Sequence, residues 1–117
     1  MIRIEKYEFG KIVINGKQFI RDIIVTSESV VEPNWWRKEG HKLFVEDIKD
    51  YIEEYKPEML IVGTGYHGFM KVQKEVVDYM RKKDIDLIAL PTETAVKLFN
   101  KCVESGRKVM GAFHLTC

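Results

Sequence analysis

The chain has 117 residues, of which 45% are hydrophobic and 32% are charged, and its 19 Lys and Arg residues nearly balance its 18 Asp and Glu residues. This length suits one domain, 1–117, whose core removes roughly two-thirds of the unfolded surface from water. Charges of both signs are interleaved and no apolar stretch reaches the roughly twenty residues of a membrane span, which argues against nucleic-acid and membrane partners.

The first part of the chain, Ile2 to Val25, has the pattern of β-strands. Asn15-Gly16 divides it, and both of these residues tolerate the positive φ angles of a type I′ turn. We therefore expect a β-hairpin over Lys11 to Thr26. Its later strand is apolar on both faces, although Arg21-Asp22 interrupts it, so this strand is expected to lie between layers.

After a connector from Ser27 to Lys42, apolar residues at helical spacing predict an amphipathic helix over Val45 to Tyr55, which Pro57 ends. The predicted elements that follow are a strand at Met59–Val62, a helix around Val72 to Met80, a strand at Ile85–Leu90, a helix with Thr92 as its N-cap that ends before Gly106, and a strand over Arg107–Thr116. This alternation of strands and helices predicts an α/β fold with a largely parallel sheet.

A glycine-rich segment, Gly63-Thr64-Gly65-Tyr66-His67-Gly68, follows a buried strand and precedes a predicted helix. Glycines let the backbone turn sharply and approach a ligand, and a helix N-terminus attracts anions. The glycine spacing matches the dinucleotide fingerprint, but Leu90-Pro91 stands where that fingerprint requires an acidic residue. The segment is interpreted first as a structural tight turn, and second as a site for a small phosphate, sulfate or carboxylate.

An anion site of this kind would use the backbone N–H groups of the bend, which are expected to point outward at the carboxyl edge of an interior strand. Arginine and lysine would neutralise the anion, and histidine would move a proton. The candidate anion-binding residues are Gly63, Thr64, Gly65, Arg37, His41, His67 and Lys71.

Two adjacent tryptophans, Trp35 and Trp36, precede Arg37 in the polar connector. We do not expect both indoles to enter one core, and an exposed indole beside arginine suits a protein interface. Trp35, Trp36 and Arg37 therefore form the candidate interaction surface. The alternative is that both indoles pin the connector onto the sheet.

The sequence offers little for metal binding or catalysis. His114 and Cys117 are close together, but zinc needs two further donors and the only other histidines are His41 and His67. There is no serine in a glycine elbow and no phosphate-gripping Gly-Lys-Ser or Gly-Lys-Thr loop. We therefore predict no metal, no cofactor and no catalytic residue. Cys102 is expected in the core, and two cysteines without a signal peptide favour the cytoplasm.

Five short motifs occur together over nearly the whole chain. They are Tyr7-Glu8-Phe9-Gly10-Lys11-Ile12, Trp36-Arg37 with Gly40-His41, Ile61-Val62-Gly63-Thr64-Gly65, Leu90-Pro91-Thr92 with Ala95-Val96, and His114-Leu115-Thr116-Cys117. In this order they resemble the Mth-domain family, which includes the adipogenesis-associated Mth domain-containing protein and a mitochondrial assembly factor of respiratory complex I.

The resemblance implies a single three-layer α/β domain with a central mixed sheet, flanking helices and an added N-terminal β-hairpin layer. It also implies that no catalytic activity is established and that family members act through protein contacts. The favoured function is a non-enzymatic interaction or assembly domain with an unknown protein partner. The alternative is a small anion-binding protein or minor enzyme, and both a monomer and a homodimer remain open.

Overall fold

The computed structural model describes all 117 residues, and its centre is a five-stranded mixed sheet with the strand order β5-β4-β10-β7-β9. These strands are β4 (Ile23–Thr26), β5 (Val30–Glu32), β7 (Met59–Thr64), β9 (Asp86–Leu90) and β10 (Val109–His114). The β10–β7 and β7–β9 pairs are parallel, whereas β4 pairs antiparallel with both β10 and β5. The predicted mixed sheet is confirmed.

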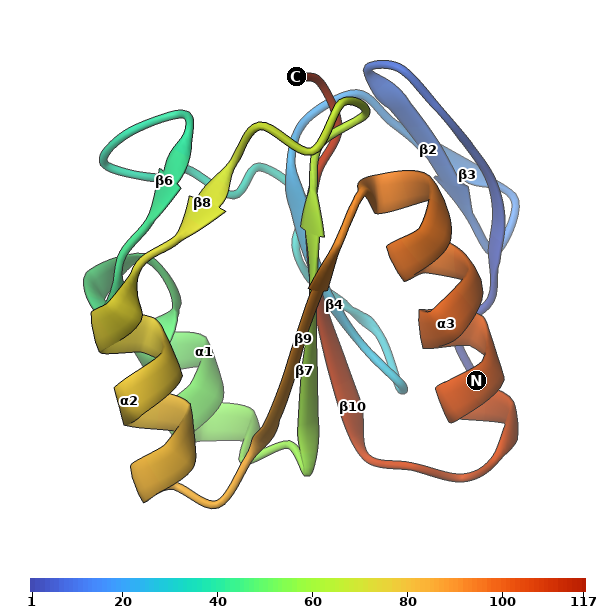
Figure 1. Ribbon diagram of the computed structural model, residues 1–117. Coiled ribbons are helices and arrows are strands. Elements are labelled where there is room, and N and C mark those ends of the chain that lie inside the picture. Colours follow the sequence, from blue (N-terminus) through green and yellow to red (C-terminus); the bar gives the residue numbers. More distant parts are fainter.

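Helices cover both faces of this sheet, which makes three layers (Figure 1). One face carries α1 (Val45–Tyr55) and α2 (Lys74–Lys82), with the short strands β6 (Lys42–Leu43) and β8 (Lys71–Val72) above them. The other face carries α3 (Thr92–Glu104) and a small sheet of β1 (Ile4–Glu8), β2 (Lys11–Ile14) and β3 (Lys17–Phe19). No helix here has the length and apolarity that crossing a membrane requires.

The core consists of two hydrophobic clusters, one on each face of the central sheet. Sixteen buried residues lie between the sheet, α3 and the small sheet, and the rings of Phe99 and Phe113 meet there edge to face at 5.6 Å. Twelve buried residues, including Leu43 and Met70, lie on the side of α1 and α2. Burial on both faces explains why β7 is continuously apolar in sequence.

The hairpin prediction is confirmed for β2 and β3 and is wrong beyond Phe19. Asn15 and Gly16 have φ angles of 49° and 79°, as the turn requires. The chain then leaves the small sheet, and β4 begins at Ile23 in the central sheet. Arg21-Asp22, which interrupts the apolar pattern, marks this change of sheet.

The helix boundaries agree with the sequence pattern in one case and differ in two. α1 has the predicted bounds, and Lys56, with φ of 54°, ends it before Pro57. α2 begins only at Lys74, because Val72 belongs to β8, which pairs with β6. Thr92 is the first residue of α3 rather than its N-cap. The glycine-rich segment therefore does not lead directly into a helix.

Candidate functional site

The glycine-rich segment lies at the carboxyl edge of the central sheet, where β7 and β10 end side by side. Thr64 at the end of β7 is in register with His114 at the end of β10. β7 is an interior strand between β10 and β9, as predicted. Ligands of α/β proteins bind at this edge, so it is the first place to test the candidate residues.

Four backbone N–H groups of this loop are already bonded within the protein. Gly65 N–H donates to Thr92 Oγ1 (2.9 Å), Tyr66 N–H to Thr116 O (2.6 Å), Gly68 N–H to Gly65 O (3.2 Å) and Phe69 N–H to Cys117 O (3.1 Å). The expectation that these amides point outward is wrong, because the segment after β10 accepts the hydrogen bonds of Tyr66 and Phe69, while Thr92 and Gly65 O accept those of Gly65 and Gly68. The geometry favours the tight turn over the anion cradle.

The loop glycines are needed for close approach between parts of the chain itself. A Cβ atom on Gly63 would lie 2.8 Å from Phe113 Cδ1 and 2.8 Å from Thr92 Oγ1. Gly65 has a φ of +109°, and its Cβ atom would overlap the carbonyl carbon of Cys117. Both positions exclude side chains for reasons that involve no ligand.

Replacing Gly65 with alanine is expected to lower the free energy of unfolding by about 3 kcal/mol, since backbone strain and steric overlap add together. Gly106 is the matched control: its φ is +79°, but nothing lies within 4 Å of its Cβ position. Gly106→Ala should therefore cost only about 1 kcal/mol, from strain alone. Urea unfolding of both variants checks this, and equal losses would contradict the close packing around Gly65.

Thr92 joins the loop to the ends of β10 and α3. Its hydroxyl donates to His114 O (2.6 Å) and accepts the Gly65 N–H, while its own N–H donates to Gly65 O (3.0 Å). The side chain is fully buried. These bonds explain why Thr92 does not cap its own helix: its hydroxyl is committed to the two neighbouring strand ends.

A buried polar cluster, formed by Asp22, Arg37 and His114, lies at the same edge. Asp22 Oδ2 accepts hydrogen bonds from Arg37 Nη1 (2.7 Å) and His114 Nδ1 (2.8 Å), and Oδ1 accepts one from the Leu115 N–H (2.8 Å). Arg37 Nη2 donates to Gly40 O (3.0 Å). Three segments far apart in the sequence meet in this cluster. Sequence analysis included Arg37 but missed Asp22, whose only signal was its interruption of an apolar run.

The electrostatics of the cluster stabilise the charged form of Asp22. Burial raises its pKa, but hydrogen bonds from His114 and the Leu115 N–H, with the charges of His114 and Arg37, outweigh burial and hold this pKa below its ordinary value. The cluster is therefore a charged anchor at neutral pH.

Burial also raises the pKa of Tyr7 to about 12, so its hydroxyl stays protonated and donates to Leu115 O (2.8 Å).

The cluster resembles a catalytic Asp–His pair in only one respect. Nδ1 of His114 faces the Asp22 carboxylate and donates a hydrogen bond to it. Nε2 is buried and has no hydrogen-bond partner, and the same is true of Arg37 Nε. A base must come within hydrogen-bond reach of its substrate. Because Nε2 is enclosed by protein, we assign it no catalytic role.

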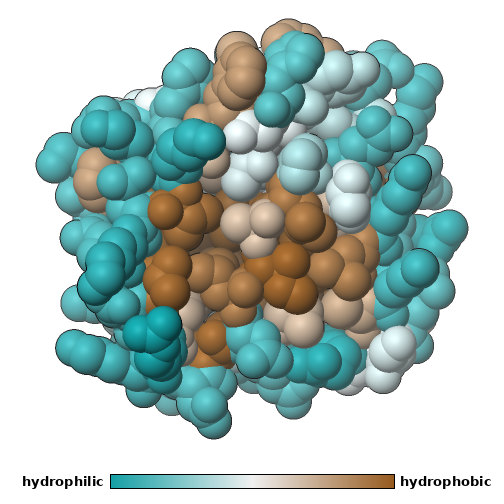
Figure 2. All heavy atoms as spheres, in the orientation of Figure 1, coloured by the Kyte–Doolittle hydropathy of each residue, from teal (hydrophilic) through white to brown (hydrophobic).

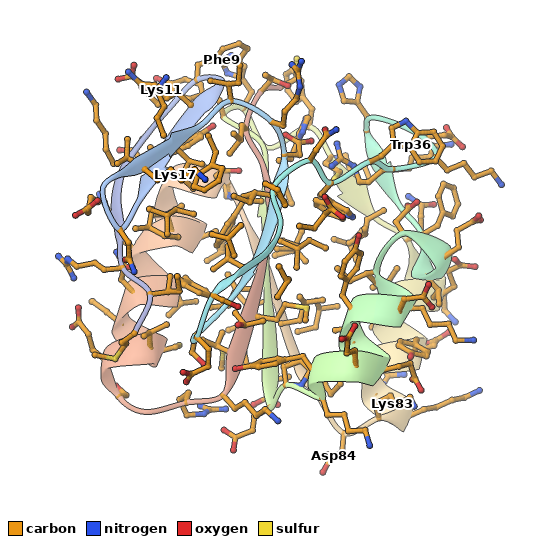
Figure 3. The ribbon with its side chains drawn as sticks, turned by 180° about the vertical axis from the view of Figure 1, so that it is seen from behind. Phe9, Lys11, Lys17, Trp36, Lys83 and Asp84 are labelled. Atoms are coloured by element: carbon orange, nitrogen blue, oxygen red, sulfur yellow. The ribbon has the colours of Figure 1, made fainter.

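The two tryptophans point in opposite directions. Trp35 is buried, its Nε1–H donates to Asp47 O (2.9 Å), and the Arg37 guanidinium lies 4.7 Å from its ring centroid. Trp36 is 77% exposed and projects from the surface (Figure 3). The predicted interaction surface is therefore wrong for Trp35 and Arg37, which pack inside the protein. The alternative that both indoles are pinned inward is wrong for Trp36.

The remaining candidates for the anion site surround this edge without forming one cradle. His41 is exposed, its ring centroid lies 6.2 Å from that of His114, and its carbonyl accepts the Lys71 N–H (2.8 Å). The exposed His67 instead stacks on Phe69, with 5.6 Å between ring centroids. The structure thus brings Arg37 and His41 to His114, whereas the loop amides are committed elsewhere.

A second feature, which the sequence analysis did not single out, is the open edge of the central sheet at β9. This strand pairs only with β7. The Asp86 N–H donates to Glu58 O (3.1 Å) on the β7 side. Backbone groups alternate in direction along a strand, so the N–H and C=O groups of Leu87 and Ala89 point away from the sheet. The edge therefore offers free hydrogen-bonding groups.

Apolar side chains surround this open edge. Figure 2 shows a hollowed hydrophobic area between α2 and α3, with a hydrophilic rim. Ile88 and Leu90 are half-buried against the α3 side of the core, Leu87 is half-buried on the α2 side, and Val77 is 37% exposed. A hollow of about 320 Å³ at the amino end of β9 is lined by Val77, Met80, Arg81, Asp84, Ile85, Asp86 and Leu87. The apolar area formed by Leu87, Ile88, Leu90 and Val77, together with this hollow at its amino end, is named the β9 groove below.

The opposite edge of the same sheet, at β5, is built differently. β5 has only three residues, Pro33 follows it, and its pairing with β4 shifts register between Ile24 and Val25. Short strands, prolines and bulges protect sheet edges from association. β9 has five residues in regular register with β7, from Asp86 opposite Met59 to Leu90 opposite Gly63. A proline also follows β9, at Pro91, but the shortness and the register shift belong to the β5 edge alone.

Comparison with known proteins finds the same sequence pattern and the same fold. Residues 4–114 match the family described as "Protein of unknown function (DUF498/DUF598)". The solved structure of MT938 is 29% identical, with a TM-score of 0.81 over 100% of each chain. The conserved hypothetical protein PH1505 from Pyrococcus horikoshii OT3 is 26% identical, with a TM-score of 0.83 over 98% of this chain and 99% of that one.

A more distant solution structure shows the fold alone. It is that of a Bordetella pertussis protein described as a Mth938-like domain, which is 19% identical with a TM-score of 0.78 over 97% of this chain and 85% of that one. The match over residues 4–114 confirms the resemblance inferred from the five motifs. The chain therefore belongs to the Mth938-like family of proteins of unknown function, DUF498/DUF598.

Proposed function

We propose that this protein is a non-enzymatic interaction domain that binds a protein partner in the β9 groove. The observation that carries the proposal is the unprotected apolar edge of β9, beside which Leu87, Ile88 and Leu90 are only half-buried. Contiguous apolar patches with polar rims are typical of protein-binding surfaces. Completing the burial of each of these side chains is worth on the order of 1 kcal/mol.

The small-anion alternative has weaker support. The amides of Gly65, Tyr66, Gly68 and Phe69 already donate within the protein, and the Arg37 guanidinium is bonded to Asp22 and Gly40. An anion would have to break these bonds before it gained its own. A partner that binds in the β9 groove breaks no such bonds, because the outward backbone groups and the apolar side chains of the groove are already accessible.

Ala89→Lys places a charge at an exposed position in the middle of the groove, so we expect it to reduce partner binding at least about tenfold, or about 1.4 kcal/mol. The matched control is Val31→Lys, since Val31 is an exposed apolar residue on the opposite edge strand β5. Partners recovered with the tagged wild-type protein would be identified by mass spectrometry and quantified with each variant. Thermal unfolding would show that all three proteins are folded.

This comparison has a clear negative outcome. If Ala89→Lys and Val31→Lys recover the same partners in the same amounts as the wild-type protein, binding does not depend on the β9 edge. The proposed contact surface would then be wrong.

A further inference from the structure

We infer that the partner contributes an extended apolar segment, which adds to β9 as a sixth strand of the central sheet. This inference rests on the proposed function and names the form of the chain that the β9 groove binds. It follows from the backbone, the shape and the charge of the groove.

The backbone of the groove favours a strand. The N–H and C=O groups of Leu87 and Ala89 point outward and are spaced two residues apart along an extended chain. A helix keeps its backbone groups within itself and cannot bond to such an edge. An extended segment satisfies both positions, and main-chain hydrogen bonds then supply part of the affinity.

The shape of the groove suits one strand better than a second copy of this protein. β9 lies at the floor of a hollow, flanked by α2 and α3 (Figures 1 and 2). Two paired strands must approach to about 4.8 Å. In an edge-to-edge pair of copies, the flanking helices of one copy would face those of the other, whereas a single extended segment brings no helices to the hollow.

The side chains around the strand define the composition of the segment. Leu87 packs toward the cluster of α1 and α2, whereas Ile88 and Leu90 pack toward the cluster of α3. Both faces of an added strand would therefore meet apolar surroundings. We expect a continuous run of apolar residues, as in strands buried on both faces, rather than alternation of apolar and polar residues.

Most charges near the groove are paired within the protein. Asp78 on α2 pairs with both Lys74 (3.2 Å) and Arg81 (3.4 Å), which leaves one positive charge in excess on α2, and Asp86 pairs with Arg107 (3.5 Å). Asp84 makes no ion pair and projects from the end of the molecule near the start of β9 (Figure 3). A complementary segment is thus uncharged along its length, because Arg81 and Asp84 line the same hollow and their charges offset each other.

The test uses ten-residue peptides displayed on phage and selected on the folded wild-type protein, and the binding of each selected peptide to Ala89→Lys is then measured. A selected peptide is then synthesised with N-methyl groups on one or the other set of alternating residues. Only the set that faces β9 donates hydrogen bonds to it. We expect methylation of one set to weaken binding at least about tenfold and methylation of the other set to leave it nearly unchanged.

Two measurements on the protein accompany the peptide series. Bound peptide should slow hydrogen exchange at the amides of Leu87 and Ala89, with no change at Val31 on the other edge. Ala89→Pro removes the outward N–H, a change that edge strands tolerate, and it should weaken binding, whereas Ala89→Val should not. Circular dichroism would show that both variants fold.

The outcomes separate this inference from the proposed function. If both methylated series bind equally while Ala89→Lys still prevents binding, the groove binds side chains without strand addition; the inference is then wrong and the proposed surface stands. Sedimentation that shows a wild-type dimer dissociated by Ala89→Lys would overturn the inference in favour of a second copy. Peptides that bind Ala89→Lys as tightly as the wild-type protein would overturn both.

Discussion

Replacing Trp35 with alanine is expected to lower the free energy of unfolding by about 3–5 kcal/mol, whereas Trp36→Ala should change it by less than about 0.5 kcal/mol. Trp35 fills part of the core beside α1, donates a hydrogen bond to Asp47 O and supports the Arg37 guanidinium on its ring. Trp36 is mostly exposed. Urea unfolding of the two variants measures the difference between adjacent residues of the same type.

A third variant separates packing from hydrogen bonding at Trp35. Trp35→Phe keeps an aromatic ring but removes the N–H group that donates to Asp47 O. We therefore expect it to lower the free energy of unfolding, but by less than Trp35→Ala does. Similar losses for Trp35→Ala and Trp36→Ala would contradict the opposite directions of the two indoles. The result also bears on the interaction surface, because a buried Trp35 cannot contact a partner in the folded protein.

Removing the carboxylate of Asp22 is expected to cost about 3–5 kcal/mol, because Asp22→Ala leaves the Arg37 charge buried without compensation. Only 4% of the Arg37 side chain is exposed. The substitution also removes the acceptor of the Leu115 N–H and the partner of His114 Nδ1. Equilibrium unfolding at neutral pH measures the loss, and a loss below about 1 kcal/mol would contradict the role of this cluster as an anchor.

Two controls test whether the buried charge causes this loss. Glu8→Gln removes an exposed carboxylate that pairs with Lys6 and Lys11, and it should leave the free energy of unfolding nearly unchanged, because water and salt screen such pairs. Asp22→Ala combined with Arg37→Met removes both charges, so the double variant should lose less stability than the sum of the two single variants. Additive losses would show that the two side chains act independently.

Asp22 also gives the protein a specific acid sensitivity. Its pKa in the folded protein lies below the ordinary value, so the folded state binds this proton less readily than the unfolded state. The stabilisation is therefore present above the ordinary pKa and is lost as the pH falls through the lower pKa of the folded protein. As the pH falls below about 5, the wild-type protein should lose more stability than Asp22→Asn. Equal losses would contradict the shift.

Local features of the sequence were sufficient where neighbouring residues decide the structure. Asn15-Gly16 forms the predicted turn because both residues accept positive φ angles, whatever surrounds them. The apolar spacing of α1 predicted its bounds, since a single helical face is buried. The five motifs were likewise sufficient to indicate the family, and residues 4–114 confirm it.

Only the tertiary structure decided how the candidate residues are used. The sequence shows that Gly65 permits a sharp turn, but Thr92 and the segment after β10 determine that its amide is bonded internally. The sequence also cannot show that Asp22 contacts His114, 92 residues away, and that Arg37 is buried beside this pair. Hydrogen-bond partners and burial depend on contacts between segments far apart in the chain, whereas turn and helix preferences depend on neighbours. β7 and β9 both have the sequence pattern of apolar strands, and only the order of strands in the folded sheet shows that β9 lies at its edge.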